Sequence, residues 1–352
     1  MDNFKFRNVL ITGGAGFIGS ALVKKLLLKT NCNIYNLDKL NYSSDLTSIN
    51  ILLENSQRNL VSRYKFFKCD LLNQKKLDEI ITYCKPDLIM HLAAESHVDR
   101  SIKYPLKFIQ NNIIGTFNLL EASRTYFENI DSNLQNKFRF HHISTDEVFG
   151  SLGHKGKFDE NSNYDPKSPY SASKASSDHL VRSWHHTFGI PSLITNCSNN
   201  YGPWQYPDKL IPVIILNALN QKKIPIYGDG QHIRDWLFVE DHIDALLLIA
   251  SKGEIGDTYC IGGDNERTNN EVAKLICSIL DNLKPISKPY SDFITYVSDR
   301  PGHDNRYAID SSFLKQKLKW LPKQEFRSGL EITVKWYLKN MKWTESLLNS
   351  KF

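Results

Sequence analysis

An apolar stretch that runs into a glycine-rich turn and then into a helical pattern constrains the fold more than any other feature of this sequence. Val9–Ile11 is a short apolar run typical of a buried strand, and apolar residues at positions 21, 22, 26 and 27 have the spacing of one helix face. Between them, glycines recur every third residue, at Gly13, Gly16 and Gly19. Glycine lets such a turn adopt positive φ and lets the backbone approach a pyrophosphate, while the helix N-terminus offers free N–H groups. Because the triplet lies between a strand and a helix, we predict a dinucleotide site here.

The end of the next predicted strand indicates which dinucleotide is bound. The strand at 33–37 ends in Asp38, which follows Gly19 by 19 residues. A carboxylate at that place accepts hydrogen bonds from the adenosine ribose hydroxyls and repels a 2′-phosphate. The neighbouring Lys39 weakens that repulsion slightly, but the carboxylate favours NAD over NADP.

Strands and helices continue to alternate through the first half of the chain. Strands are predicted at 64–67, 87–90 and 138–143, and helices over 77–81 and from about 105 to 127. This alternation predicts an α/β fold with a Rossmann-type, doubly wound parallel sheet. Ligands bind such a sheet beyond the carboxyl ends of its strands, and Asp38, Asp70, Ala93 and Thr145 all lie at such ends.

A tyrosine and a lysine four residues apart form the first candidate for chemistry. Tyr170 and Lys174 lie on one face of a predicted helix, which Ser168 would cap and Pro169 would begin. An ammonium one turn from a phenol favours the phenolate, so we predict a lowered pKa for Tyr170 and a role as acid or base near neutral pH. The same spacing occurs in ordinary surface pairs, and the pair alone leaves that alternative open.

Two adjacent carboxyl side chains form the second candidate. Asp146 and Glu147 come just after an apolar strand and after Ser144 and Thr145. Elimination of water next to a ketone needs one group that gives a proton and another that takes one. Two carboxyls in different surroundings can hold those opposite states. A solvated acidic loop is the alternative, but the position between Thr145 and the Tyr170 helix favours a catalytic pair.

The alternation loosens after Gly202. Prolines at 203, 207 and 212 precede a predicted helix at 213–219, and strands are predicted at 224–227, 236–239 and 258–261. The chain is expected to leave the first domain near 202, return near 239 and leave again near 265. We therefore predict an NAD-binding domain of residues 1–202 and 239–265, and a smaller, discontinuous α/β substrate domain of residues 203–238 and 266–352.

Composition restricts the possible partners and the compartment. The 352 residues carry a formal charge of +6, which is spread along the chain and indicates no nucleic-acid partner. The six cysteines are widely spaced without a C-x-x-C pair, so we expect buried free thiols rather than a disulfide framework or a zinc site. No His, Asp and Glu arrangement indicates another metal. Without a signal-peptide core or a run of about 20 apolar residues, a cytoplasmic protein without a membrane partner is expected.

Five stretches of the chain resemble the extended short-chain dehydrogenase/reductases, and among these the dTDP-glucose 4,6-dehydratases. They are Leu92–Ser101, His142–Gly150, Ser168–His179, Asn196–Pro203 and Asp299–Asp304. The resemblance covers nearly the whole chain. The departure that we note is Phe149, where the family often has tyrosine, and it leaves the chemical groups in place.

The resemblance implies a reaction and a role for each catalytic residue. A nucleoside-diphosphate glucose would be oxidised at C4, lose water from C5 and C6, and regain the hydride at C6, with bound NAD as the cofactor. Tyr170 would take the 4-hydroxyl proton, with Lys174 and Thr145 assisting. Asp146 would be the general acid for the departing 6-hydroxyl, and Glu147 the base at C5.

The resemblance also implies two sets of binding residues, which include several of the candidates above. The cofactor set is Gly13, Gly16, Phe17, Ile18, Gly19, Asp38, Lys39, Asp70, Leu71, Leu92, Ala93, Ala94, Ser96, Asn111, Tyr170, Lys174 and Asn200. The substrate set is Ser96, Thr145, Asn199, Lys209, Leu210, Pro225, Tyr227, Arg234, Asn269, Asp299, Arg300 and His303. Arginines suit bidentate contacts with the two phosphates. For His97, Asp99 and Arg100, ligand contacts and a structural hydrogen-bonded cluster both remain open.

Several alternatives stay open at this point. A sugar-nucleotide 4-epimerase of the same fold would keep Tyr170 and Lys174 but would not need the two carboxyls. A UDP-glucose 4,6-dehydratase differs by one methyl group on the base, which a pocket discriminates by only about 1–3 kcal/mol. A catalytically silent NAD-binding regulator would be expected to lack Tyr170 or Lys174. In the family, the helices at 105–127 and after Tyr170 pair across a dimer, so a homodimer is expected.

Overall fold

A seven-stranded parallel sheet forms the larger part of the molecule in the computed structural model, which describes residues 4–56 and 58–349. Its strands are β1 (Asn8–Thr12), β2 (Asn33–Asp38), β3 (Tyr64–Lys68), β4 (Leu88–His91), β5 (Arg139–Thr145), β6 (Ser192–Cys197) and β10 (Thr258–Ile261). Their order across the sheet is β3-β2-β1-β4-β5-β6-β10, and each neighbouring pair is parallel. This is the predicted doubly wound Rossmann-type sheet, and its order reverses between β1 and β4.

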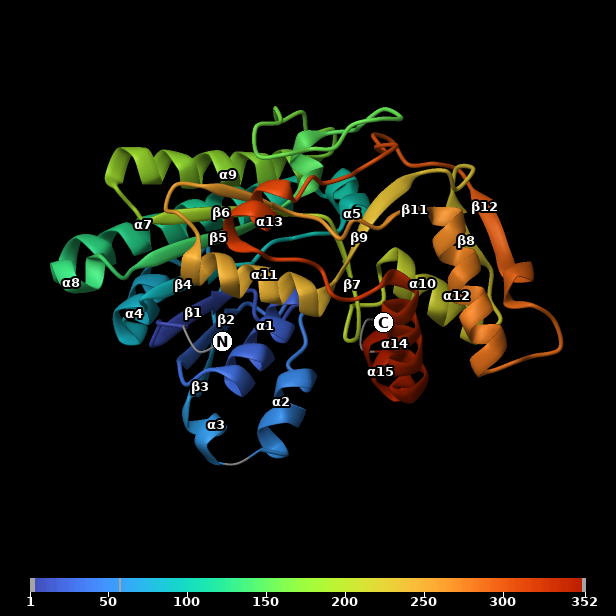
Figure 1. The fold of residues 1–352 in the computed structure, drawn as a ribbon. Coiled ribbons are helices and arrows are strands. Elements are labelled where there is room, and N and C mark those ends of the chain that lie inside the picture. The colour runs from blue at the N-terminus through green and yellow to red at the C-terminus, as the bar shows by residue number, and fades with distance from the viewer. Residues whose placement is uncertain (1–3, 57, 350–352) are drawn as a thin grey trace.

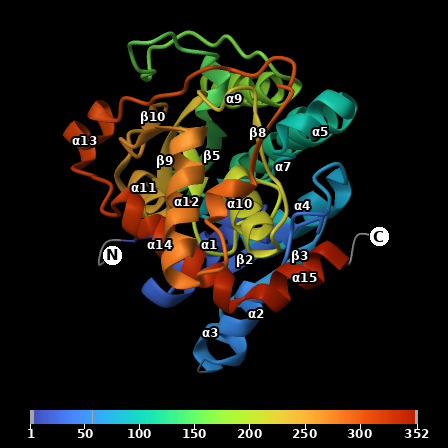
Figure 2. The same ribbon diagram turned by 90° about the vertical axis from the view of Figure 1, so that its right-hand side faces the viewer.

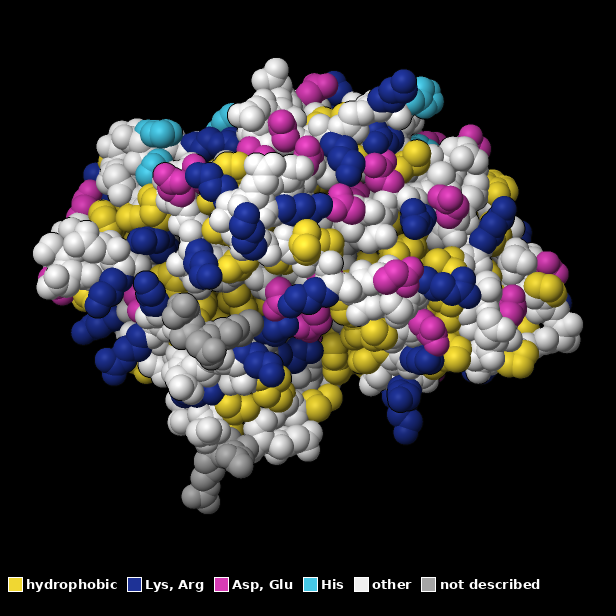
Figure 3. Space-filling view, viewed as in Figure 1, with side chains coloured by type: hydrophobic (Ala, Val, Ile, Leu, Met, Phe, Trp, Pro, Cys, Tyr) yellow, Lys and Arg dark blue, Asp and Glu magenta, His cyan; other side chains and the backbone are white. Residues whose placement is uncertain are grey.

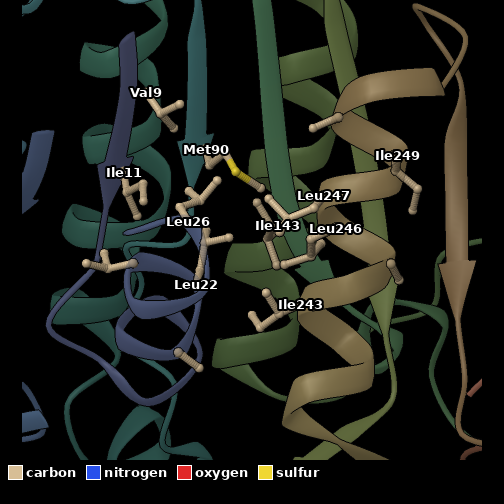
Figure 4. Close-up of a cluster of buried hydrophobic side chains, with 14 of the residues drawn as sticks. Val9, Ile11, Leu22, Leu26, Met90, Ile143, Ile243, Leu246, Leu247 and Ile249 are labelled. Carbon is tan, nitrogen blue, oxygen red and sulfur yellow. The ribbon is translucent and has the colours of Figure 1, made fainter. Parts of the chain in front are cut away.

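Helices cover both faces of this sheet (Figure 1). The helices of this part are α1 (Phe17–Lys29), α2 (Thr47–Glu54), α3 (Arg58–Ser62), α4 (Gln74–Cys84), α5 (Val98–Lys103), α6 (Pro105–Phe108), α7 (Gly115–Asn129), α8 (Ser132–Gln135), α9 (Pro169–Phe188) and α11 (Val239–Lys252). Side chains of α1 and α11 meet on one face, where Leu22, Leu26, Ile243 and Leu246 pack together (Figure 4). Side chains of α4, α7 and α9 form a second apolar core on the other face.

The helix that carries the tyrosine–lysine pair begins as predicted. Ser168 caps α9, Pro169 is its first residue, and Ser168 and Ser171 exchange side-chain-to-backbone hydrogen bonds in a capping box. The helix ends at Gly189, whose φ of 70° is in the left-handed region that glycine adopts without strain. The start and the direction of α9 are therefore fixed by local sequence.

The single helix predicted from about 105 to 127 is interrupted. A π-helical segment, η1 (Ile109–Ile114), separates α6 from α7. The wide turn places the buried Asn112 beside α9, where its carbonyl oxygen accepts a 2.7 Å hydrogen bond from Ser177 and its amide donates to Ser173 at 2.8 Å. An extra residue in a helical turn leaves no mark in the apolar spacing, so the sequence pattern missed it.

The second lobe lies beside the carboxyl ends of the sheet. It contains β7 (Asn199–Tyr201), α10 (Leu210–Leu219), β8 (Ile224–Tyr227), β9 (Ile233–Phe238), β11 (Glu266–Thr268), α12 (Asn269–Leu283), η3 (Tyr290–Phe293), β12 (Ile294–Val297), α13 (Ser312–Leu318), α14 (Phe326–Lys339) and α15 (Met341–Asn349). A three-stranded sheet β11-β9-β7 and a pair β12-β8 pack with α10, α12 and α14 around one core (Figure 2). Leu314 of α13 and Trp320 pack instead in the core under α1 and α11. The predicted domain boundaries stay a prediction.

Two boundaries in this lobe differ from the sequence prediction. Helix α10 begins at Leu210 rather than 213, because Pro212 lies within its first turn, where a missing N–H costs no helical hydrogen bond. Strand β9 begins at Ile233 rather than 236 and ends at Phe238, so Arg234 lies within it. Its register with β11 pairs Arg234 with Arg267, and no apolar alternation marks that end of the strand.

The cysteines and the surface agree with the composition. All six cysteines are buried and free in the described part of the chain. Charges of both signs are interspersed over the face in Figure 3, without a continuous basic tract. No helix within residues 4–56 and 58–349 is long and apolar enough to cross a membrane.

The turn between β1 and α1 generates a stability prediction. A Cβ on Gly19 would lie 2.1 Å from the Gly13 carbonyl oxygen, whereas a Cβ on Gly16 would lie 3.3 Å from the same atom. We expect Gly19→Ala to lower the free energy of unfolding by about 1–3 kcal/mol through overpacking, and Gly16→Ala to lower it by clearly less. Urea unfolding of the two variants and the wild type measures this. Equal losses would contradict the packing argument.

Candidate active site

A cavity of about 570 Å³ opens at the carboxyl edge of the large sheet and runs from the glycine turn to the second lobe. It brings together residues that the sequence placed in separate motifs. All predicted catalytic and cofactor residues line it: Gly13, Gly16, Phe17, Ile18, Gly19, Asp38, Lys39, Asp70, Leu71, Leu92, Ala93, Ala94, Ser96, Asn111, Thr145, Asp146, Glu147, Tyr170, Lys174 and Asn200. Of the predicted substrate residues, Asn199, Lys209, Leu210, Pro225, Tyr227, Arg234, Asn269, Arg300 and His303 also line it, whereas Asp299 does not.

The glycine turn leaves a backbone-lined hollow at the start of α1. Gly13 has a φ of 75°, and a Cβ there would meet the Ala93 backbone at 2.7 Å. Helix α1 begins at Gly16 without a side-chain cap, so no side chain occupies the N-terminus of the helix. This end of the cavity therefore presents N–H groups and the positive end of a helix dipole, which suit an anion.

Asp38 lies at the end of β2 beside this hollow and is buried. One carboxylate oxygen accepts a 3.1 Å hydrogen bond from the Ala15 amide, and the other accepts from the Leu40 amide at 2.8 Å and Ser44 at 3.0 Å. Burial raises the pKa of Asp38, but these three donors oppose the rise. Lys39 points to Glu95, at 3.3 Å, and to Asn111, so its charge is matched by a carboxylate.

The Tyr170 hydroxyl is less acidic than the sequence predicts. Burial raises its pKa well above the ordinary value, and the nearby Glu147 charge adds to the rise. A hydrogen bond with the Thr145 side chain lowers the pKa by less. The predicted lowering by Lys174 is therefore wrong for the protein alone, because helix spacing shows which residues are neighbours but not how far they are withdrawn from water.

Lys174 is buried, and its ammonium points behind the cavity wall into strand β5. It donates a 2.9 Å hydrogen bond to the Ile143 carbonyl oxygen and lies 3.4 Å from His142 Nε2. His142 Nε2 lies 3.1 Å from Asp178 Oδ1. The sequence analysis missed His142 and Asp178, although Asp178 follows Lys174 by four residues on α9 and so continues the face that begins with Tyr170.

The two adjacent carboxyls have different surroundings. Burial raises the pKa of Asp146 well above its ordinary value, and the neighbouring Glu147 and Asp235 raise it further. Asp146 Oδ1 accepts from the Thr145 hydroxyl at 3.3 Å, while Oδ2 is buried without a partner. Burial also raises the pKa of the half-buried Glu147, but Arg300, Arg234 and Lys209 oppose the rise. Both carboxyls thus have raised pKa values, but the rise is large for Asp146, which favours the neutral acid, and is opposed by three cations for Glu147.

Cationic side chains of the second lobe face these carboxyls. Arg234 is buried and donates to the backbone carbonyl oxygens of Ile233, at 2.7 Å, and Asp304, at 2.8 Å. Arg300 donates to Asp99 at 2.9 Å, and Lys209 donates to the Ser96 carbonyl oxygen at 2.8 Å. These contacts fix the positions of the three cations at the cavity wall before any ligand enters.

The side chains in the stretch after β4, for which the sequence left both ligand contacts and a structural cluster open, connect the two lobes. Asp99 accepts hydrogen bonds from Arg300 and, at 3.0 Å, from Tyr227. His97 Nε2 lies 3.9 Å from Asp208, and the Arg100 guanidinium stacks 3.8 Å from the Tyr42 ring centre. His97 and Asp99 line the cavity, so the stretch combines a structural cluster with part of the cavity wall.

Asp299 is an exposed residue outside the cavity lining, and it contacts a pair of stacked imidazoles. Its carboxylate accepts from His303 Nδ1 at 2.6 Å and lies 3.1 Å from His232 Nε2, and the ring centres are 3.8 Å apart. These three ligand atoms lie within 4.8 Å of one another. Burial lowers the pKa of His303 to about 4, so the ring is neutral at pH 7 and donates to Asp299. Asp299 thus orients His303, which lines the cavity.

The chain matches a family of known enzymes over most of its length. The family model described as GDP-mannose 4,6 dehydratase matches residues 10–333. A dTDP-glucose 4,6-dehydratase of Neisseria meningitidis serogroup B is 53% identical over 352 residues, which cover 98% of this chain and 97% of the relative.

Two solved structures have the same fold as this chain. The dTDP-glucose 4,6-dehydratase of Bacillus anthracis in complex with NAD has a TM-score of 0.84 and 40% identity, and the match covers 97% of this chain and 99% of that one. The dTDP-glucose 4,6-dehydratase of Streptomyces venezuelae, solved with NAD bound, has a TM-score of 0.86 and 37% identity, with 96% and 99% covered.

The raised pKa of Asp146 predicts how this carboxyl changes the free energy of unfolding with pH. Because the folded pKa of Asp146 is raised, the carboxyl stabilises the fold only while it is protonated, and that contribution is lost as the pH rises. Asp146→Asn should therefore unfold with a higher free energy than the wild type at pH 7. The gain should vanish near pH 4, about the pKa of an unfolded aspartate, and grow above it by at most about 1.4 kcal/mol per pH unit.

Urea unfolding at several pH values measures the effect. Asp99→Asn serves as the control of opposite sign, because the hydrogen bond and charge of Arg300, with other donors, outweigh burial and lower the pKa of Asp99. This variant should lose stability at pH 7. A pH-independent gain for Asp146→Asn, or no gain, would show that the carboxyl is not held neutral.

Proposed function

This chain belongs to the GDP-mannose 4,6-dehydratase family, and we propose that it dehydrates dTDP-glucose with bound NAD to the 4-keto-6-deoxy sugar nucleotide. One observation carries the proposal. Within one cavity, a tyrosine–lysine pair suited to oxidation lies beside two adjacent carboxyls with different surroundings: burial and carboxyl neighbours raise the pKa of Asp146 well above its ordinary value, whereas cations oppose the rise for Glu147. Oxidation alone needs the first pair, whereas removal of water needs both.

The residues at the glycine turn fit NAD. The hollow under Gly13 and Gly16 is lined by backbone, and the uncapped start of α1 suits the pyrophosphate. Asp38 would accept from the adenosine ribose, and its charge disfavours a 2′-phosphate. Asn200 is held in place by a 2.9 Å hydrogen bond from His242 Nδ1 to its side-chain oxygen. When bound, NAD supplies a hydride acceptor that is regenerated within each turnover.

Tyr170 is the residue that takes the proton from the 4-hydroxyl. Its hydroxyl lies in a buried position beside Thr145, whose side chain hydrogen-bonds to it. The neutral phenol is favoured by the protein alone, so a positive charge near the ring is needed to make it a base. Lys174 supplies that charge from the same face of α9, one turn away.

Asp146 and Glu147 complete the elimination once C4 is a ketone. The C5 proton is then acidic, and Glu147 takes it, with Arg300 and Arg234 opposing the burial that raises its pKa. Asp146, held neutral by burial and by its carboxyl neighbours, gives a proton to the departing 6-hydroxyl. The buried Asp146 Oδ2 has no partner within the described residues, so it is available to the substrate.

The diphosphate of the substrate is assigned to the cationic wall of the second lobe. Arg234, Arg300 and Lys209 line the cavity there, and guanidinium groups bind phosphate oxygens in pairs. His303, oriented by Asp299, adds a donor. Asn199 has a buried side-chain oxygen without a partner and is assigned to the sugar nucleotide.

The alternatives differ in what they require of these residues. A 4-epimerase would leave Asp146 and Glu147 without a use, and a silent NAD-binding regulator would leave Tyr170, Lys174 and both carboxyls without one. UDP-glucose would place the same groups at the same bonds, so the choice of thymine over uracil follows the named relatives. The free, buried cysteines favour the cytoplasm as the location.

The assembly in this proposal is a homodimer formed through α6, α7 and α9. Exposed apolar side chains gather along α6, α7 and the segment between these two helices: Leu106, Ile109, Ile114 and Phe117. The Phe117 ring meets Trp184 of α9 edge to face, with ring centres 5.7 Å apart. A contiguous apolar surface of this kind is typical of a subunit contact.

Replacement of Glu147 by Gln separates the dehydratase from the epimerase. Glu147→Gln keeps size and hydrogen bonding but cannot accept a proton at neutral pH. With dTDP-glucose it should slow release of the 4-keto product by about 10²–10⁴-fold, the usual worth of a positioned general base. Hydride transfer should be less affected, so enzyme-bound NADH should accumulate in stopped-flow absorbance.

Isotope exchange and a control variant sharpen this experiment. In D₂O the wild type should place deuterium at C5 of the product, and Glu147→Gln should exchange that position far more slowly. Glu160→Gln is the matched control, because Glu160 is a carboxyl with a burial-raised pKa outside the cavity, and it should turn over normally. Turnover of Glu147→Gln at the wild-type rate, or a galactose epimer as the wild-type product, would contradict the proposal.

Charges placed on the exposed apolar surface should separate the proposed dimer. The combined variant Leu106→Asp and Ile109→Asp would bury unpaired carboxylates at the contact, which is strongly unfavourable. Light scattering coupled to size-exclusion chromatography should then give the mass of one chain, against two for the wild type. Leu134→Asp, at an exposed apolar site on α8, should leave the mass unchanged. An unchanged mass for the double variant would place the contact elsewhere.

A further inference from the structure

A set of polar side chains lies behind the cavity wall, and the reaction proposed above gives them no role. His142 on β5 and Asp178 on α9 are fully buried, and neither lines the cavity. A carboxylate withdrawn from water is costly unless hydrogen bonds and an opposite charge compensate it. Its contacts therefore indicate what holds it there.

One oxygen of Asp178 is surrounded by donors, whereas the other makes no hydrogen bond of good geometry within the described residues and has His142 as its close neighbour. Oδ2 accepts from Ser144 at 2.8 Å, from Tyr164 at 2.8 Å and from Asn196 at 3.2 Å. Oδ1 lies 3.1 Å from His142 Nε2. A carboxylate can only accept, so the imidazole tautomer that stabilises the ionised Asp178, and lowers its pKa, is the one with the proton on Nε2.

The same imidazole nitrogen lies close to Lys174. The distance from His142 Nε2 to Lys174 Nζ is 3.4 Å, so His142 stands between the carboxylate and the ammonium. Lys174 is itself buried, and its other polar contact is the Ile143 carbonyl oxygen. Asp178, on the far side of His142, is the carboxylate whose charge acts on Lys174.

His142 affects the pKa of Asp178, and Asp178 in turn affects the pKa of Lys174. Burial alone would raise the pKa of Asp178, but the hydrogen bond and charge of His142, with Lys174 and Ser144, hold it below its ordinary value. Burial lowers the pKa of Lys174, and the Asp178 charge opposes that fall. His142 therefore helps to keep the carboxylate ionised, and the carboxylate helps to keep the lysine protonated.

We infer that Asp178 is the buried counter-ion that keeps Lys174 charged, and that His142 is the bridge that holds this counter-ion ionised. Both are positioning residues, because they act on the reaction through Lys174 and touch neither ligand. The inference rests on the proposed role of Lys174 as the positive charge beside Tyr170. It explains why a fully buried carboxylate lies one helical turn beyond the lysine.

Other titratable groups face this set from every element packed around it. On the cavity side they are Tyr170 of α9 and Cys197 of β6, and on the opposite side they are His91 of β4, Tyr164 and Arg182. Burial lowers the pKa of His91 and raises that of Cys197, so both are neutral near pH 7. Arg182 donates to Tyr164 at 2.9 Å and has no contact with Lys174, so Asp178 dominates the lysine.

Direct titration of Lys174 tests the inference apart from turnover. In protein with ¹³C-labelled lysine, the Lys174 resonance is assigned by its loss in Lys174→Arg, and its midpoint is followed with pH. Asp178→Asn should lower the midpoint by about 1–3 pH units, the range that a nearby opposite charge produces. The alkaline limb of the kcat–pH profile should move to lower pH by the same amount.

Matched variants exclude a merely structural effect. Tyr164→Phe removes one donor from Asp178 but leaves its charge, so the Lys174 midpoint should stay at the wild-type value. His142→Leu removes the donor that keeps Asp178 ionised and should lower the midpoint, whereas His142→Gln retains an N–H at that place and should restore it. If Asp178→Asn does not fold, the Lys174 midpoints of the two His142 variants test the inference.

Specific results would overturn the inference. An unmoved midpoint in Asp178→Asn, a shift in Tyr164→Phe as large as in Asp178→Asn, or equal midpoints in the two His142 variants would each do so. A midpoint that shifts as expected in an enzyme that does not dehydrate dTDP-glucose would leave the counter-ion in place and refute the proposed function instead.

Discussion

The withdrawal of ionisable side chains from water at the carboxyl end of β5 is the constraint on which the rest of the structure depends. Asp146, Tyr170, Lys174 and Asp178 are all buried there, and for each of them burial penalises the charged form, which water would solvate. Burial therefore sets their protonation before any ligand enters. The neighbouring groups decide whether the charged form is restored. Donors around Asp178 lower its pKa, whereas the carboxyl neighbours of Asp146 raise its pKa further and favour the neutral acid.

The two carboxyls come from the lobe with the large sheet, and the cations that face them come from the second lobe. The large sheet brings Asp146 and Glu147 to its edge, because the carboxyl ends of parallel strands meet there. The cations that oppose the pKa rise of Glu147 come from the second lobe, on β9 and in the segment after β12. The difference between the two carboxyls thus arises only when both lobes pack together.

Much of this could be predicted from the sequence, and the remainder has physical reasons. Strand ends, the glycine turn and the capping box at Ser168 follow from local periodicity and backbone chemistry, so Asp38, Thr145 and Tyr170 were placed correctly at one cavity. The lowered pKa expected for Tyr170 was wrong, because desolvation depends on the whole fold. His142 was missed because a histidine in an apolar strand resembles a core residue, and Asp299 is not among the residues that line the cavity although its neighbour Arg300 is.

Three of the buried polar atoms without hydrogen-bond partners belong to residues that line the cavity. Asp146 Oδ2, Asn199 Oδ1 and Arg300 Nε are buried without partners in the described part of the chain, and all three residues line the cavity. Behind the wall, one oxygen of Asp178 accepts three hydrogen bonds. Unsatisfied groups cost stability, and their place at the cavity means that a ligand which pairs with them recovers that energy on binding. A saturated network at the same place would make a more stable protein with no remaining donors or acceptors for a sugar nucleotide.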